Sequence, residues 1–204
     1  GCLKTLSSID RFLAGYHADG GCDEGPGYWN AAGASLFDYL DILHGAPGGA
    51  VAAFGEPLIA NIGRYLMRMH IAGEWFVNFA DGGARPGVSA DLVRRYGERV
   101  GDRELSAFGC SFLGSKRPER GSSWMFFRSL TALRNEGANR GRKASPPLLQ
   151  DAWMDGIQVL TARERGGTES GFFIAAKGGH NAESHNHNDV GSFIAYADGL
   201  PVLI

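Results

Sequence analysis

Hydrophobic residues follow two different spacings along the chain, and the change falls near residue 135. Before it, apolar side chains recur every three or four positions between breaks rich in glycine and proline, which is typical of amphipathic helices. Ser89 and Ser123 are expected to cap two of these helices. The short run 75–79 is interpreted as either a strand or a turn. The predicted helices cover residues 3–13, 29–43, 58–69, 89–99, 103–112 and 123–134.

After a polar stretch the pattern becomes that of a β-sheet. Residues 135–147 contain Asn-Glu-Gly, Gly-Arg-Gly-Arg-Lys and Pro-Pro, a composition typical of linkers. The short runs that follow are rich in β-formers and bounded by Gly or Asp-Gly, which predicts antiparallel strands. These strands cover residues 157–162, 171–177, 192–197 and 201–204. We therefore expect a multidomain α+β protein with helices over 1–140, a linker over 141–150 and the start of a sheet over 151–204.

The charge balance excludes two classes of partner. The 204 residues carry 20 basic and 22 acidic side chains, a formal net charge of -2. Nucleic acid and anionic membrane surfaces attract proteins with a large basic excess, so we expect neither as a partner. No apolar run approaches the length that spans a bilayer, and membrane insertion is not expected either. The three scattered cysteines suggest neither a disulfide framework nor a thiolate zinc site.

The chain opens at Gly1 without a methionine, and its last residues, 200–204, form an apolar run. We expect it to be a piece of a longer protein. No signal peptide is recognisable, so the sequence does not predict where the protein is located.

The densest polar cluster reads His-Asn-Ala-Glu-Ser-His-Asn-His-Asn-Asp and ends at Asp189. In an extended segment His185, His187 and Asp189 would share one face, with Asn186 and Asn188 on the other. Imidazole is a strong zinc ligand, and a zinc site normally needs three or four ligands. The alternative is a polar loop whose side chains satisfy backbone groups in turns. Three further histidines lie singly on helical patterns and are interpreted as ordinary helix residues: His17, His44 and His70.

A second cluster joins the first two predicted helices and reads Asp-Gly-Gly-Cys-Asp-Glu-Gly-Pro-Gly-Tyr-Trp over residues 19–29. Its glycines allow close approach of a ligand to the backbone. An aromatic pair, Tyr28 and Trp29, beside the carboxylates of Asp23 and Glu24 suits a sugar. Structural alternatives remain open, because Trp29 could be the first core residue of its helix and Tyr28 a hydrogen-bonding residue at the rim.

Together the two clusters and the order of helices before strands resemble the heparinase II/III-like polysaccharide lyases. Residues 23–29 are similar to the Glu-Gly-x-x-Tyr segment of that family. Residues 184–193 are similar to its His-x-His-x-Asp-x-x-Ser-Phe segment, which is the more specific of the two. Asn-Phe-Ala-Asp at 78–81 and the segment 199–204 also look familiar from such chains.

The resemblance implies part of an incomplete (α/α) toroid followed by the first strands of an antiparallel β-sandwich, with a substrate cleft between them. It also implies β-elimination of a uronic-acid-containing polysaccharide, of the heparin/heparan type or the alginate type. Tyr28 would be the proton donor and often the base, and His185 would lie in the active site. His187 would bind a structural zinc whose other ligands lie outside the chain, as does an upstream active-site Asn or His.

From the clusters and the resemblance together, Glu24, Trp29, Asn186 and Asn188 are the candidate substrate-binding residues. The resemblance further implies a periplasmic or secreted protein, and a homodimer is possible.

Two other functions stay open. A glycoside hydrolase on a helical toroid would use paired carboxylates chosen from Asp19, Asp23 and Glu24, which leaves the histidines unexplained. A non-catalytic carbohydrate-binding or zinc-stabilised module would use His185 and His187 with Asp189 to hold a metal for structure alone.

Overall fold

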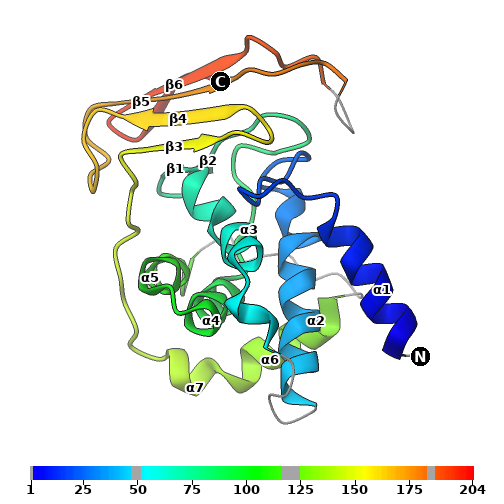
Figure 1. Cartoon of the computed structure of the whole chain (residues 1–204). Helices are drawn as coiled ribbons and strands as arrows, with labels where there is room; N and C mark the ends of the chain where they lie inside the picture. Colours follow the sequence, from blue (N-terminus) through cyan, green and yellow to red (C-terminus); the bar gives the residue numbers. More distant parts are fainter. Residues whose placement is uncertain (1, 47–51, 116–124, 183–186) are drawn as a thin grey trace.

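The computed structural model describes residues 2–46, 52–115, 125–182 and 187–204. Within these ranges the chain is a mixed α+β protein, in which a group of helices lies on one side of a five-stranded antiparallel sheet (Figure 1). The predicted α+β class is confirmed. No helix in the described part of the chain is long and apolar enough to cross a membrane.

The helices follow the predicted order with small shifts at their ends. α2 begins at Gly33, later than predicted, because residues Tyr28–Asn30 form a separate 3-10 turn. Gly33 packs directly on the indole of Trp29, where a Cβ would lie 2.3 Å from Nε1. The α-helices are α1 Cys2–Leu13, α2 Gly33–Gly45, α3 Pro57–Arg68, α4 Ala90–Val100, α5 Arg103–Ser111, α6 Phe126–Arg134 and α7 Glu136–Asn139. A second 3-10 turn covers Ala53–Gly55.

The helix caps match the prediction only in part. Ser89 precedes α4 as predicted, but its side chain makes no cap hydrogen bond. α4 ends where Gly101 takes the left-handed conformation, with φ 71°, and α5 then begins behind Asp102, whose carboxylate accepts a 2.9 Å bond from Leu105 N. Ser123, the other predicted cap, lies outside the described residues.

The polar stretch 135–147 is helical at its start, before the linker predicted over 141–150. α7 occupies part of this stretch, because Asn135 and Asn139 each donate a side-chain hydrogen bond to the carboxylate of Asp91 in α4. A pattern of polar residues, which suggested a linker, here reflects side chains that bind a buried acid. Residues 142–149 carry no helix or strand.

The sheet is a meander in which each strand pairs with the next one along the chain. Its order is β3 Asp151–Met154, β4 Val159–Arg163, β5 Phe172–Lys177, β6 Phe193–Ala197 and β7 Leu200–Leu203. β3 was not predicted from sequence. A separate two-stranded ribbon consists of β1 His70–Ala72 and β2 Trp75–Phe76. The interpretation of His70 as a helix residue is therefore wrong, because α3 ends at Arg68 and His70 opens β1.

One hydrophobic core runs from the helices into the sheet. Alternate residues of β4 to β6, including Val159, Phe173 and Tyr196, belong to the same buried cluster as residues of α3, α4 and β1. The Arg163 guanidinium also crosses this contact and donates to the carbonyls of His70 and Ile71 at 3.1 and 3.0 Å. The sheet therefore packs directly on the end of α3 and on β1.

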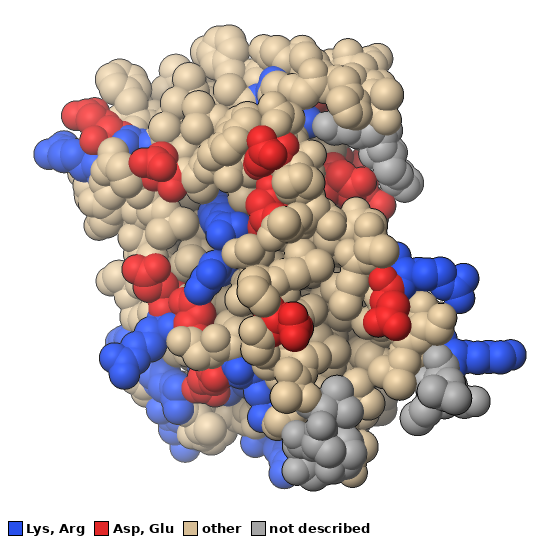
Figure 2. All heavy atoms as spheres, in the orientation of Figure 1, with Lys and Arg blue, Asp and Glu red and all other residues tan. Residues whose placement is uncertain are grey.

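The opposite face of the sheet is apolar and exposed. Trp153, Leu160 and Phe193 form one cross-strand row with Ala176, and Ile174 lies in the next row. The exposed fractions of these four large side chains run from 40% to 54%. Figure 2 shows charged side chains of both signs over the helical part and few over the sheet.

Candidate functional site

A groove of about 540 Å³ lies where the helices meet the turn between β3 and β4. We call it the boundary groove. Its walls come from the end of α1, the loop after α1, the 3-10 turn at Tyr28 and the loop after β5 (Figure 1). Polar and aromatic lining residues are Phe12, Tyr16, His17, Cys22, Asp23, Glu24, Tyr28 and His180. Both sequence clusters thus contribute to one groove.

Tyr28 is accessible from the groove. It is 46% exposed and lines the groove at the start of the 3-10 turn. The loop before it is held by Gly25, whose φ of 87° is left-handed, and a Cβ there would lie 2.7 Å from Phe79 O. Only glycine fits this close approach, so the glycine of the motif has a structural cause.

Glu24 and Asp23 line the same groove, whereas Asp19 is engaged in structure. Oδ1 of Asp19 accepts a 2.9 Å bond from Gly21 N, and Oδ2 accepts a 2.7 Å bond from Gly156 N. Asp19 therefore fastens the loop after α1 to the β3–β4 turn. Of the three carboxylates considered for hydrolysis, the structure leaves Asp23 and Glu24 as groove residues.

Trp29 is a core residue in this structure. Its side chain has no exposed surface, and Nε1 donates a 2.7 Å bond to the carbonyl of Ile62 in α3. A sugar cannot reach a ring that is fully enclosed, so the expectation that Trp29 binds substrate is replaced by the structural alternative.

The electrostatic character of the groove comes from imidazoles and carboxylates. None of the described residues that line it is Lys or Arg. Nδ1 of His17 lies 3.5 Å from Oδ2 of Asp19. Burial raises the pKa of Tyr16 well above its usual value and that of Cys22 to about 12, so both groups stay neutral at physiological pH.

The comparisons with known proteins give no relative. No model of a known protein family matches the sequence, and neither does any curated protein. The function is therefore inferred from the site.

We call residues 180–192 the histidine segment. Its residues 183–186, which include His185 and Asn186, fall outside the described part of the chain. His187 and Asp189 are described, and both contact the loop between β2 and α4. Nε2 of His187 lies 2.5 Å from Oδ1 of Asp81, and Oδ2 of Asp189 accepts a 2.7 Å bond from Ala80 N. Asn188, which lies between them, is exposed and has a φ of 57°.

The described residues do not assemble a zinc site. Beside His187 they supply one carboxylate, Asp81, and no group of three potential ligands occurs among them. If the imidazole donates Nε2–H to Asp81, Nδ1 is left as its metal-binding atom. Zinc at His187 stays a prediction, and no chemical step below uses it.

Three groove residues were not selected from the sequence as site residues. His180 belongs to the histidine cluster, and its place five residues before His185 was the available signal. The interpretation of His17 as a helix residue is wrong, because α1 ends at Leu13 and His17 lies with Tyr16 in the loop after it. Only the packing of the β3–β4 turn against this segment brings them into a site. A Cβ on Gly156 would lie 2.2 Å from Cβ of His17.

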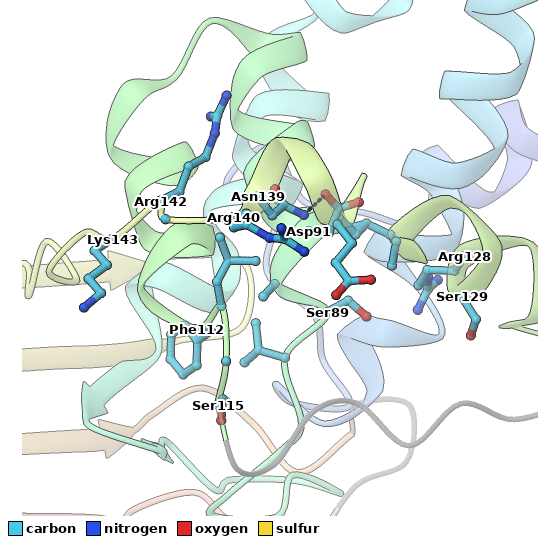
Figure 3. Close-up of a pocket in the computed structure, with 18 of the residues that line it drawn as sticks. Ser89, Asp91, Phe112, Ser115, Arg128, Ser129, Asn139, Arg140, Arg142 and Lys143 are labelled. Atoms are coloured by element: carbon cyan, nitrogen blue, oxygen red, sulfur yellow. Dashed lines mark hydrogen bonds between the residues drawn. The ribbon is translucent and has the colours of Figure 1, made fainter. Parts of the chain in front are cut away.

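A second cavity, of about 610 Å³, lies away from all the predicted site residues. Figure 3 shows it between the start of α4, the end of α5, α6 and the α7 segment. Asp91 on its wall is already bound by Asn139 at 2.8 Å, and Arg128 binds Asp38 at 2.8 Å. Asp91 and Arg128 are thus used to join helices.

Proposed function

We propose that the protein is a polysaccharide lyase of the heparinase II/III-like type that cleaves a uronic-acid-containing polysaccharide by β-elimination in the boundary groove. One observation carries the proposal. Tyr28, the half-exposed tyrosine of the first motif, shares the groove with His180, which lies in the loop of the second motif. Two sequence clusters more than 150 residues apart thus meet at one cavity of oligosaccharide size.

β-Elimination removes the proton alpha to the uronate carboxylate and expels the glycosidic oxygen at the beta position. The expelled alkoxide needs a proton, and a phenol hydroxyl has a pKa suited to giving one. Tyr28 is the proposed proton donor. In the family type the tyrosine is often also the base: as a phenolate it would take the alpha proton and then return that proton to the expelled glycosidic oxygen. His185 is the proposed second active-site residue.

The negative charge that forms on the substrate must also be stabilised. Removal of the proton turns the uronate carboxylate into a dianionic enolate, which is unfavourable without donors or cations around it. His17 and His180 in the groove are candidates for this role, together with His185 and the amides of Asn186 and Asn188. Glu24 is the proposed partner for sugar hydroxyls.

The proposed function also implies a fold for the longer protein. The helices are proposed to be part of an incomplete (α/α) toroid, and the sheet the first layer of a β-sandwich. The exposed apolar face with Trp153, Leu160 and Phe193 supports the second part, because such a face is normally buried by another layer.

A glycoside hydrolase is the second candidate, favoured by the two carboxylates of Asp23 and Glu24 in the same groove. The products separate the two reactions. Elimination forms a conjugated C4=C5 double bond that absorbs ultraviolet light, whereas hydrolysis adds water and forms none.

The test supplies a heparan-type polymer, an alginate-type polymer and a neutral glucan to the full-length protein. Ultraviolet absorbance and new reducing ends are followed together. One double bond for each new reducing end on a uronate polymer supports the lyase. Reducing ends without absorbance would establish the hydrolase, and binding without cleavage would leave a carbohydrate-binding module.

A further inference from the structure

The loop between β2 and α4 contacts both sequence clusters. On one side, the loop packs under the segment before Tyr28: a Cβ on Gly25 would lie 2.7 Å from Phe79 O, and one on Gly82 would lie 3.2 Å from Cδ of Pro26. On the other side, its residues bind the histidine segment. We call residues 79–82 the bridging loop.

Two hydrogen bonds join the bridging loop to the histidine segment, and each of the two segments supplies one carboxylate. Asp81 of the bridging loop binds Nε2 of His187 at 2.5 Å, and Asp189 of the histidine segment binds the bridging loop at Ala80 N at 2.7 Å. An ionised carboxylate only accepts, so His187 donates through Nε2–H. These two bonds join the segments at two neighbouring points and fix the position of one segment relative to the other.

The backbone of the bridging loop and that of the histidine segment both have an unusual conformation at the contact. Ala80 has a φ of 56° and Asn188 a φ of 57°, so each segment turns sharply at the contact. Beyond it, Ser192 N donates to Asp189 O at 2.8 Å and Gly191 N donates to Lys177 O at 2.8 Å. The histidine segment is therefore anchored to β5 on one side and to the bridging loop on the other.

We propose that Asp81 is a positioning residue, which sets the distance between Tyr28 and the histidine segment by holding His187 against the bridging loop. Its catalytic consequence rests on the proposed function. Asp81 itself lies outside the groove lining and acts through His187. The contact is partly exposed, with 44% of the His187 side chain and 27% of the Asp81 side chain accessible. Exposed pairs contribute little to global stability, so its loss should act locally.

The test compares hydrogen exchange in the wild-type protein, Asp81→Ala, His187→Ala and the double variant. If the two side chains act as a pair, each single variant should raise exchange of the 187–192 amides and of Ala80 by about tenfold, and the double variant should add nothing further. Asp10→Ala, which changes an exposed acid on α1, is the control and should alter neither region. Unchanged exchange in either single variant, or additive effects in the double variant, would overturn the proposal.

Two further arms separate alternative causes. Wild-type protection should persist in a metal chelator, because the bond is direct. Loss of protection in the chelator to the level of Asp81→Ala would show that a metal, rather than the Asp81 carboxylate, holds His187, and would overturn the proposal. In turnover, Asp81→Ala should lower kcat by roughly 10-fold to 100-fold with KM nearly unchanged, and Asp81→Asn should restore part of the loss. If the wild-type protein forms no double bonds, the proposed function fails, and the exchange data still decide on the contact.

Discussion

At the scale of single residues, burial separates structure from function among side chains that look equivalent in the sequence. Tyr28 and Trp29 are neighbours, yet the first is half-exposed on the groove and the second is fully enclosed. The sequence could not separate them, because it identifies a turn before a helix but not which side of that turn faces α3. His70 shows the same point, since a histidine on a helical pattern becomes a buried strand residue.

Replacing Tyr28 by phenylalanine tests the acid role. The variant keeps the ring and its packing and removes only the hydroxyl that would move the proton. We expect turnover to fall by roughly 10²-fold to 10⁴-fold, with little change in melting temperature or substrate affinity. The measurement is the rate of double-bond formation on a uronate polymer. Activity within a few-fold of the wild type would show that Tyr28 is a rim residue.

His70 should make stability depend on pH. Burial, helped by Arg163, lowers its pKa to about 4, while the unfolded chain has an ordinary histidine pKa near 6.5. The unfolded state therefore binds the proton first, so stability is full above about pH 6.5 and falls towards pH 4, by on the order of 3 kcal/mol.

Urea unfolding at several pH values measures this effect. His70→Gln, which retains a donor near Nε2, should flatten the loss in that pH window, whereas the exposed His180→Gln should retain it. An unchanged pH profile in His70→Gln would contradict the assignment.

At the scale of elements, the periodic helices and the later strands were predictable, and the short elements were not. Period-3.6 stripes identified α1 to α5, and α2 to α5 each bury one face, whereas no described residue of α1 is buried. β3 and α7 have four residues each and carry too few positions for a period. They form because of tertiary bonds, such as the pairing of β3 with β4 and the binding of Asn139 to Asp91.

Asp91 is the acid that joins α4 to the α6–α7 corner. Burial alone would raise its pKa, but hydrogen bonds from Asn139, Asn135 and Arg94 outweigh this and hold the pKa below its usual range. Asp91→Ala would remove the acceptor for the partly buried amides of Asn135 and Asn139 and one of the two acidic partners of the buried Arg94, and we expect the free energy of unfolding to fall by about 3 kcal/mol.

Urea unfolding at neutral pH measures this loss, with the exposed Glu136→Ala of α7 as the control at no more than about 0.5 kcal/mol. Equal effects in the two variants would show that the cluster does not join the helices.

At the scale of the whole molecule, the helices and the sheet form one body because residues from both enter one core. The sequence separates them at the change of period and places part of the groove wall in two clusters, but Phe12, Tyr16 and His17 lie outside both clusters. It could not predict that the β3–β4 turn closes the groove or that the bridging loop joins the clusters. Those contacts depend on close approaches at Gly156 and Gly25, which leave no periodic signal.

Replacing Arg163 tests how the sheet is held to the helical part of the protein. The buried guanidinium of Arg163 donates to carbonyls of β1 and to Leu149 O at 2.7 Å. Arg163→Met retains the length of the side chain but leaves the carbonyls without donors, so we expect a loss of about 3 kcal/mol in thermal or urea unfolding. The matched control is Arg165→Met, two residues along and exposed, which should be neutral. A small loss at Arg163 would mean that the apolar core alone holds the sheet.

The central claim is that the boundary groove binds an acidic sugar. The most direct measurement follows the backbone amide resonances of the Tyr28→Phe variant during titration with a short uronate oligosaccharide, with a neutral oligosaccharide of the same linkage as the control. We expect shifts that saturate at residues 15–17, 22–28, 156–157 and around His180, for the uronate sugar only. Shifts centred on the cavity beside Asp91, or equal shifts with the neutral sugar, would contradict it.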